Sequence, residues 1–426
     1  MPTNNSYINN LVSGYKRVWH SPGLSASWEQ KIGWRKRTTA GALKTIELLV
    51  TPFNPQGMAL ERMRLGIIEP RTVTAAEAIV RAREHSGLSP DNIVHKIIEI
   101  ESELFTPQEV TAAYKILGDI VRKVKGKLRE GMEPEDKLAL VYRTIEKKGF
   151  KRANPDGHLF ITCLLKKILI CDASSFILLA VAQEQGWPVS LVSVPEHVFA
   201  RWEDNAAKFN FDFGKIHPDE LYFKQYLVAK TEPLDENGVL ALVFHSRGST
   251  KAQSGRYAEA IMDFDEAIRL NPKNEYTFAN RGNYKARIGR YDEALADYDE
   301  AIRLNPRFAL AYINRGRVKA LLGRYEETIA DCNEAIRLNP KAAIAFSNRG
   351  AAKVRLGRYE EAIADCNEAI GRDPKYATAF MNRGDARFKL GQNAAAIADY
   401  EEAIKLNPKS AEVIHRLSVA RQKLNS

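Results

Sequence analysis

The second half of the chain repeats one arrangement of apolar and polar positions every 34 residues. In each unit, small and apolar residues recur at helical spacing, a glycine interrupts them, and a second helical stretch ends before a proline. The glycine can adopt the positive φ that ends a helix, and the proline cannot continue one. The pattern therefore predicts pairs of helices in five units, which span residues 241–274, 275–308, 309–342, 343–376 and 377–410.

The residues that recur in these units are those of a known repeat. Their shared skeleton is Asn-Arg-Gly, Gly-Arg-Tyr, Glu-Ala-Ile and Asn-Pro, and an aromatic residue fills the fourth position of each unit. The array closely resembles the tetratricopeptide repeat, which implies an all-α solenoid whose first helices line a concave groove. In residues 411–426, Val413, Leu417 and Ala420 share one stripe, so this segment predicts a helix that caps the last unit.

Asparagine recurs at the sixth position of four units, at Asn280, Asn314, Asn348 and Asn382. Because an amide both donates and accepts hydrogen bonds, this ladder can hold the main chain of a bound peptide, as in some members of the repeat family that the array resembles. The same side chains could instead bridge neighbouring repeats. The sequence leaves both interpretations open.

Charge adds a preference for the partner. The formal net charge is +10, and the first helices of the repeats are basic while the second helices are acidic. Much of this charge is expected to form ion pairs between helices, and base left over on the groove side would favour an acidic protein or peptide partner. A short basic run at residues 34–37 is typical of a solvated surface, so nucleic acid is not expected as a partner.

The first half of the chain shows no repeat. Residues 1–100 predict a helical region of unclear role. Thr106 and Glu109 form a capping box that opens a long helix. Further along, an apolar helix begins at Cys171, and a β-branched strand follows at residues 189–194. This succession predicts an α+β domain.

A hairpin is predicted for residues 197–213, because aromatic and polar residues alternate after a polar turn. If Trp202 and Ala207 flank the turn as a pair, His197 lies directly opposite Asp212 on one face of the sheet. The sequence therefore predicts that these two side chains are neighbours.

Cys171 lies at the start of its helix, where unpaired N–H groups and the helix dipole would stabilise a thiolate. Together with the words Cys-Asp, Gln-Gly-Trp-Pro and Pro-Glu-His-Val-Phe-Ala-Arg-Trp, the order of cysteine, histidine and aspartate in residues 100–230 resembles the transglutaminase-like superfamily of papain-type thiol enzymes. The domain, placed at residues 101–240, looks most like the bacterial branch in which it precedes tetratricopeptide repeats.

The resemblance also implies roles for three residues. Cys171 would be the nucleophile, His197 its base and later the acid, and Asp212 the group that orients the imidazole. The sequence departs from the family at Glu196, where relatives often have glycine before the histidine.

The other cysteines predict no further chemistry. Cys163, Cys332 and Cys366 lie among apolar neighbours or in packing positions of the repeats, and no pair has the spacing of a structural zinc site. A set of His158, Cys163 and Cys171 also lacks a recognised spacing. We therefore expect no metal site and no cofactor.

Composition and the length of the apolar segments indicate in which cellular compartment the protein is expected. Hydrophobic residues make up 45% of the chain and charged residues 27%, the balance of a folded soluble protein. No apolar stretch reaches the about 20 residues of a membrane span, and the first residues lack the apolar block of a signal peptide. The sequence predicts a cytoplasmic protein without a membrane partner.

Two functions remain open at this point. In the first, the groove recruits a protein or peptide and Cys171 attacks an amide or thioester carbonyl, which leads to hydrolysis or acyl transfer. In the second, the chain is a non-catalytic scaffold or regulator whose thiol-enzyme fold survives as an interaction surface. The two share the groove and differ at the thiol.

Overall fold

The computed structural model describes residues 70–152, 159–194, 197–212, 214–217 and 233–425. Residues 1–69, on which most of the expected N-terminal helical region falls, lie outside this part. The first described helix is α5 (Pro70–Glu84). The chain divides into two compact units, Met1–Val80 and Arg81–Ser426, and the candidate sites lie in the second.

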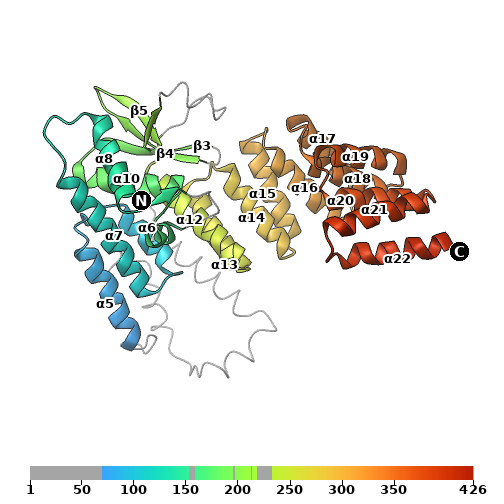
Figure 1. The fold of residues 1–426 in the computed structure, drawn as a ribbon, viewed down its shortest axis with the longest axis horizontal. Helices are drawn as coiled ribbons and strands as arrows, with labels where there is room; N and C mark the ends of the chain where they lie inside the picture. The colour runs from blue at the N-terminus through green and yellow to red at the C-terminus, as the bar shows by residue number, and fades with distance from the viewer. Residues whose placement is uncertain (1–69, 153–158, 195–196, 213, 218–232, 426) are drawn as a thin grey trace, which may run out of the picture. The chain divides into compact units, whose positions relative to one another are not determined.

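The helices before the repeats are grouped beside a small sheet (Figure 1). They are α6 (Val94–Ser102), α7 (Pro107–Lys125), α8 (Pro134–Lys147), α9 (Phe160–Lys166) and α10 (Cys171–Gln185). Helix α7 begins with the predicted capping box, because Thr106 accepts a hydrogen bond from the Glu109 N–H and the Glu109 carboxylate accepts one from the Thr106 N–H.

Four antiparallel strands form the sheet and follow one another in chain order. They are β3 (Val189–Val194), β4 (His197–Glu203), β5 (Lys208–Asp212) and β6 (Lys215–His217). Trp202 on β4 stacks on Phe209 on β5, with ring centroids 6.4 Å apart, and both are buried. A short parallel pair, β1 (Lys151–Arg152) and β2 (Ile168–Leu169), lies apart from this sheet in the strand pairing. The domain is thus α+β, as predicted.

The register of β4 and β5 differs from the predicted one by two residues. Trp202 pairs with Phe209, whereas the sequence predicts a pair with Ala207. His197 is therefore diagonal to Asp212 instead of directly opposite it. Because side chains alternate between the faces of a sheet, a shift of two residues keeps both on the same face.

The turn between the strands explains the shift. The carboxylate of Asp204 accepts hydrogen bonds from the N–H groups of Ala206 and Ala207, at 2.8 and 2.7 Å. The same side chain accepts a bond from the indole of Trp202 at 2.8 Å. An aspartate that organises its own turn in this way draws Ala207 out of the ladder and into the turn.

Helix α10 is the centre of this domain. Every residue from Ala173 to Ala182 is buried, so the helix is enclosed on all sides. It contacts α7, α8 and α9 as well as strands β3 and β4. Because close-packed interiors resist displacement, the enclosed helix holds its first residue, Cys171, in a fixed place.

The repeats form antiparallel helices that stack in chain order (Figure 1). They are α12 (Glu236–Gln253), α13 (Tyr257–Leu270), α14 (Glu275–Arg287), α15 (Tyr291–Leu304), α16 (Ala309–Leu321), α17 (Tyr325–Leu338), α18 (Ala343–Arg355), α19 (Tyr359–Arg372), α20 (Ala377–Lys389) and α21 (Asn393–Leu406). A last helix, α22 (Ala411–Asn425), packs Val413, Leu417 and Ala420 against α21. In the described part of the chain, no helix is both long and apolar enough to cross a bilayer.

Small residues set the spacing of each helix pair. A Cβ added at Gly384 would lie 2.7 Å from the ring of Tyr400, and one at Gly350 would lie 2.9 Å from the sulfur of Cys366. Glycine therefore permits the close approach of the two helices. Cys332 and Cys366 are fully buried free thiols, as expected for packing residues.

Ion pairs recur along the array with the period of the repeats. In each unit an arginine on the first helix binds an aspartate on the second helix, 16 residues further on, at Arg247–Asp263, Arg281–Asp297, Arg315–Asp331, Arg349–Asp365 and Arg383–Asp399. These aspartates are buried. A second cation four residues after each arginine binds the same carboxylate. Much of the base on the first helices is thus already paired.

Candidate active site and repeat groove

Cys171 is the first residue of α10. Lys167 ends α9 in the left-handed conformation, with φ of 53°, and β2 then leads the chain to α10. The preceding residue, Ile170, is extended and provides no side-chain cap for the helix. The first N–H groups of α10 are therefore not covered by an N-cap side chain, which is the setting expected from the sequence.

His197 is the first residue of β4, and Asp212 is the last residue of β5. The imidazole Nε2 and the Asp212 Oδ2 are 3.0 Å apart. Their side chains are 12% and 15% exposed. A carboxylate bonded to one ring nitrogen fixes the orientation of the imidazole, so Nδ1 faces away from Asp212.

Two contacts bring the start of α10 to the start of β4. The backbone N–H of Val198, the neighbour of His197, hydrogen-bonds the sulfur of Cys171. The hydroxyl of Ser175 donates to the carbonyl of Val198 at 3.4 Å. The charge of His197 also acts on Asp172, the residue after the cysteine. The cysteine therefore lies beside the bonded histidine and aspartate.

The thiol of Cys171 is held in its neutral form. Burial raises its pKa to about 12, and the charge of Asp172 adds to the rise. The hydrogen bond from Val198 acts in the opposite direction but is the smaller effect. Cys171 lies at the helix start that the sequence predicts, whereas the raised pKa of its thiol runs against the stabilised thiolate expected there.

Asp172 is the residue whose importance the sequence did not reveal. The Cys171 sulfur donates to its Oδ1 at 3.2 Å. Burial raises the pKa of the Asp172 carboxyl, whereas the bond from Cys171 and the charge of His197 lower it. The available signal was an acidic residue directly after a cysteine at a helix start, but its half-buried position beside the thiol could not be read from the sequence.

The remaining thiol of the domain is a core residue. Cys163 is 1% exposed, and burial raises its pKa to about 12. His158, which completes the zinc set weighed above, lies outside the described residues. Among the residues that are described, no group of three or more histidine, cysteine, aspartate or glutamate side chains could hold a metal ion.

In the repeats, two of the four asparagines bridge neighbouring units. Asn382 donates to the carbonyl and the hydroxyl of Ser347 in the preceding unit, at 3.2 and 3.0 Å. Asn280 contacts the ring of His245 in the preceding unit at 3.2 Å. These contacts favour the structural interpretation of Asn280 and Asn382.

The other two asparagines have different surroundings. The position that Ser347 and His245 occupy in their units is apolar before Asn314 and Asn348, where it is Ala279 and Ile313. The Nδ2 of Asn348 is buried and has no hydrogen-bond partner among the described residues. The peptide interpretation therefore stays open at Asn314 and Asn348.

The helices that carry these two residues also expose other side chains. Arg317 on α16 and Arg355 on α18 are exposed. Leu310 on α16 and Ile344 on α18 are 49% and 38% exposed. The surface of these two first helices thus combines base with apolar side chains.

Two kinds of protein family match the chain. The transglutaminase-like superfamily matches residues 111–215, which include Cys171, His197 and Asp212. The tetratricopeptide repeat matches residues 241–274, 280–343 and 347–411. No curated protein matches the chain.

Several solved structures of repeat proteins are similar to the chain. YrrB, described as having an unusual peptide-binding site, is 20% identical over 41% of this chain and 91% of its own, with a TM-score of 0.35. A thermophilic repeat protein of Thermus thermophilus, TTC0263, is 20% identical over 43% and 99%, with a TM-score of 0.38. The first repeat domain of human RPAP3 is 30% identical over 28% and 95%, with a TM-score of 0.28. With its two family matches, the chain joins a transglutaminase-like domain to an array of tetratricopeptide repeats.

Proposed function

We propose that the protein binds a protein or peptide partner in its repeat groove and uses Cys171 to cleave or transfer an acyl group. The observation that carries the proposal is the bond of 3.0 Å between His197 and Asp212 beside the start of α10. An oriented imidazole next to a cysteine is the minimum equipment of a thiol acyl enzyme.

The chemistry begins with a neutral thiol. As the sulfur attacks an amide carbonyl, the proton of Cys171 passes to His197 and a carbon–sulfur bond forms. The imidazolium, which Asp212 stabilises, then gives this proton to the leaving nitrogen as the carbon–nitrogen bond breaks. Water or a primary amine attacks the resulting thioester and loses a proton to His197. The carbon–sulfur bond then breaks, and His197 gives the proton to the sulfur, which restores the thiol. Water yields hydrolysis, and an amine yields acyl transfer.

The raised pKa of Cys171 decides when the proton moves. Because burial and the charge of Asp172 raise the pKa of Cys171, the proposed mechanism starts from the neutral thiol, whose proton passes to His197 during the attack. The N–H groups at the start of α10, which no N-cap side chain covers, would bind the oxyanion that develops at the carbonyl oxygen.

In this proposal the partner binds in the repeat groove. Asn314 and Asn348, unlike the two bridging asparagines, would hold the main chain of the bound peptide. Arg317 and Arg355 add positive charge, and the exposed Leu310 adds an apolar contact. We propose a partner segment that carries both acidic and apolar side chains.

A glutamine-rich protein substrate tests the chemistry. Release of ammonia reports hydrolysis, and incorporation of a fluorescent primary amine reports transfer. Cys171→Ala should abolish both, and Asp212→Asn should lower the rate by about 10²- to 10⁴-fold. Cys163→Ala, a thiol of the same domain outside the site, should keep the parent rate. An unchanged rate in Cys171→Ala would end the proposal.

One observation favours a second candidate, a non-catalytic scaffold. The pKa of about 12 at Cys171 is that of a packed thiol rather than of an activated one. A scaffold would bind acidic peptides on an array with an affinity that falls in Asn348→Ala and Arg317→Glu but not in Cys171→Ala. Amide turnover by the parent protein would exclude this candidate.

A further inference from the structure

The recurring arginine–aspartate pairs of the repeats form an ion-pair ladder, and this ladder continues from the first unit into the domain that precedes it. In later units the same arginine that binds the aspartate of its own repeat also bonds a side chain on the second helix of the preceding repeat, at 2.6 Å each time. These contacts are Arg281–Asp265, Arg315–Asp299, Arg349–Asn333 and Arg383–Asn367. Arg247 belongs to the first unit, so no preceding repeat supplies it with such a partner.

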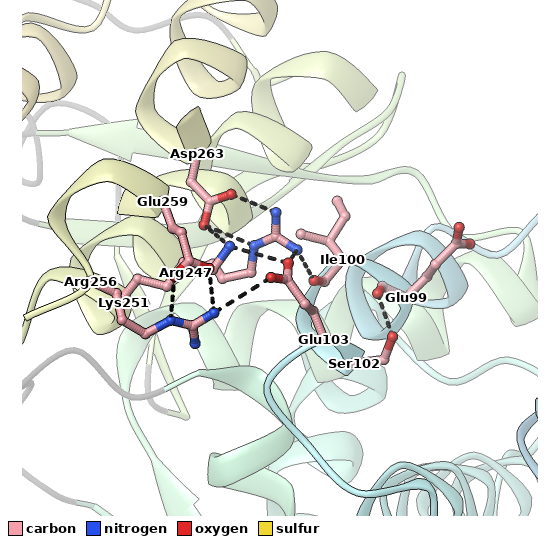
Figure 2. A network of polar contacts seen from close by, with 9 residues as sticks. All are labelled: Glu99, Ile100, Ser102, Glu103, Arg247, Lys251, Arg256, Glu259 and Asp263. Atoms are coloured by element: carbon pink, nitrogen blue, oxygen red, sulfur yellow. Dashed lines mark hydrogen bonds and ion pairs between the residues drawn. The ribbon is translucent and has the colours of Figure 1, made fainter. Parts of the chain in front are cut away.

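Glu103, at the end of α6, takes this place (Figure 2). Arg247 Nη1 lies 2.9 Å from a carboxylate oxygen of Glu103 and also donates to the carbonyl of Ile100. Lys251 is 3.1 Å from the same oxygen of Glu103, and Arg256 is 3.7 Å from the other. Helix α6 therefore contacts the first repeat in the way that the second helix of one repeat contacts the first helix of the next.

The residue between these contacts faces the opposite way. Glu101 is 1% exposed. Its two oxygens accept hydrogen bonds from the N–H groups of Phe160 and Ile161, both at 2.8 Å. These N–H groups belong to the first turn of α9, so Glu101 caps that helix. The chain then runs from α9 through β2 directly to Cys171.

The charges that act on the pKa of Glu101 come from the same parts of the molecule. Burial raises the pKa of Glu101 to about 7, the two N–H bonds and the charge of Arg247 lower it, and the charge of Asp172 raises it. Cys163 on α9 also feels the charge of Glu101. Glu101 thus feels the charge of Arg247 in the first repeat and the charge of Asp172, the neighbour of Cys171.

We propose that Arg247 and Glu101 are positioning residues for the thiol site. Arg247 of the first repeat binds α6 as the equivalent arginines bind a preceding repeat. Through Glu101, α6 in turn caps the helix that leads to Cys171. The inference rests on the proposed function only in taking Cys171 as the working thiol. A partner that displaces α12 on binding in the groove would act on Cys171 by this route.

The test compares two arginines of the same ladder in the full chain. Arg247→Ala and Arg315→Ala each remove the bonds to their own aspartate and to the preceding element. Asp263 keeps Lys251 at 3.0 Å, and Asp331 keeps Lys319 at 2.9 Å, so neither variant strands a carboxylate. Alkylation of Cys171 is followed by peptide mass mapping from pH 6 to 10, and hydrogen exchange is followed over residues 159–170.

We expect a response from Arg247→Ala alone. Loosening the segment hydrates the thiol, and a fall of half a unit in its pKa gives about a threefold gain in thiolate at pH 8. The alkylation profile should shift to lower pH, and the amides of Phe160 and Ile161 should exchange faster. Glu101→Gln, which weakens the cap without touching the array, should act in the same direction.

Three results would overturn the inference. Equal effects of Arg247→Ala and Arg315→Ala would show a general loosening of the array. An unchanged profile in Arg247→Ala would show that α6 transmits nothing. Faster exchange near Phe160 without a shift in alkylation would show that the path ends at α9. Alkylation reports the thiol whether or not it turns over an amide, so these results are independent of the proposed activity.

Discussion

Both the repeats and the transglutaminase-like domain bury carboxylates, but they satisfy them differently. In the array, Asp331 receives two cations, Arg315 and Lys319, and every unit repeats this arrangement. In the domain, the buried Glu101 receives two backbone N–H groups, and the half-buried Asp172 receives a thiol. A paired cation stabilises the charged form of a buried carboxylate, whereas neutral donors stabilise it less, so that burial can raise the pKa of the carboxyl group. The carboxylates of the array are thus paired with cations, whereas burial raises the pKa values of Glu101 and Asp172 in the domain.

Removing one aspartate of the array should have the largest effect. Asp331→Ala leaves Arg315 and Lys319 without their shared carboxylate, and loss of one partner of a buried ion pair costs about 3–5 kcal/mol. Thermal unfolding followed by circular dichroism would measure this loss, since the repeats dominate the helix signal. Glu334→Ala, which removes only an exposed pair with Arg337, is the control and should leave the transition unchanged. Equal transitions in both variants would show that the ladder does not hold the array together.

The buried carboxyl of the domain should give a pH dependence instead. The pKa of Glu101 is about 7 in the folded chain, against 4.5 for an ordinary glutamate. The folded state holds the proton more tightly, so its stability falls as pH rises from about 4.5 to about 7. The span of the two pKa values corresponds to about 3 kcal/mol. Glu101→Gln has no carboxyl proton to lose. The difference in unfolding free energy between this variant and the parent protein should therefore change by that amount, in favour of the variant, from pH 4 to pH 8.

Tryptophan fluorescence suits this measurement because the repeats contain no tryptophan: Trp187 and Trp202 lie in the domain, and the other three precede residue 70. His95 contributes the opposite slope, since burial lowers its pKa to about 4 and its stabilising effect is lost as pH falls below 6.5. It is present in both proteins, so the difference between them isolates Glu101. A difference that stays constant with pH would show that Glu101 is charged throughout, like the aspartates of the array.

The same contrast separates what the sequence could predict from what it could not. The helix pairs, the glycine approaches and the burial of Cys332 follow from a period of 34 residues, because each unit tests the assignment of the others. The domain offers one copy of each element. Its α+β class and the pairing of His197 with Asp212 were accessible, but the side chain of Asp204 displaced the predicted register.

The state of the thiol was beyond the sequence for a related reason. The helix start at Cys171 was visible, and the carboxylate of Asp172 stood next to it in the sequence. Which of the two effects is larger depends on burial, and burial comes from elements distant in the chain, such as the strand that carries Val198. Likewise, Glu103 can be identified as a stand-in for a repeat residue only when α6 is seen against α12.

The smallest expected effect distinguishes two asparagines at the same repeat position. Asn382→Ala removes bonds to Ser347 and should cost about 1 kcal/mol of stability. Asn348→Ala should cost nothing measurable, because the buried Nδ2 of Asn348 has no partner in the described part of the chain. Chemical unfolding of both variants, monitored by circular dichroism, would detect the difference.

If the two variants lose the same stability, Asn348 is a bridge like Asn382, and the proposed peptide site loses this residue. If only Asn382→Ala is destabilised, the array keeps at Asn348 a buried amide donor that its own fold does not use. Burying such a donor unpaired is unfavourable, and a bound main-chain carbonyl would remove the penalty. Binding of acidic peptides should then weaken in Asn348→Ala while the fold is unaffected, which places a functional exception inside the more regular of the two regions.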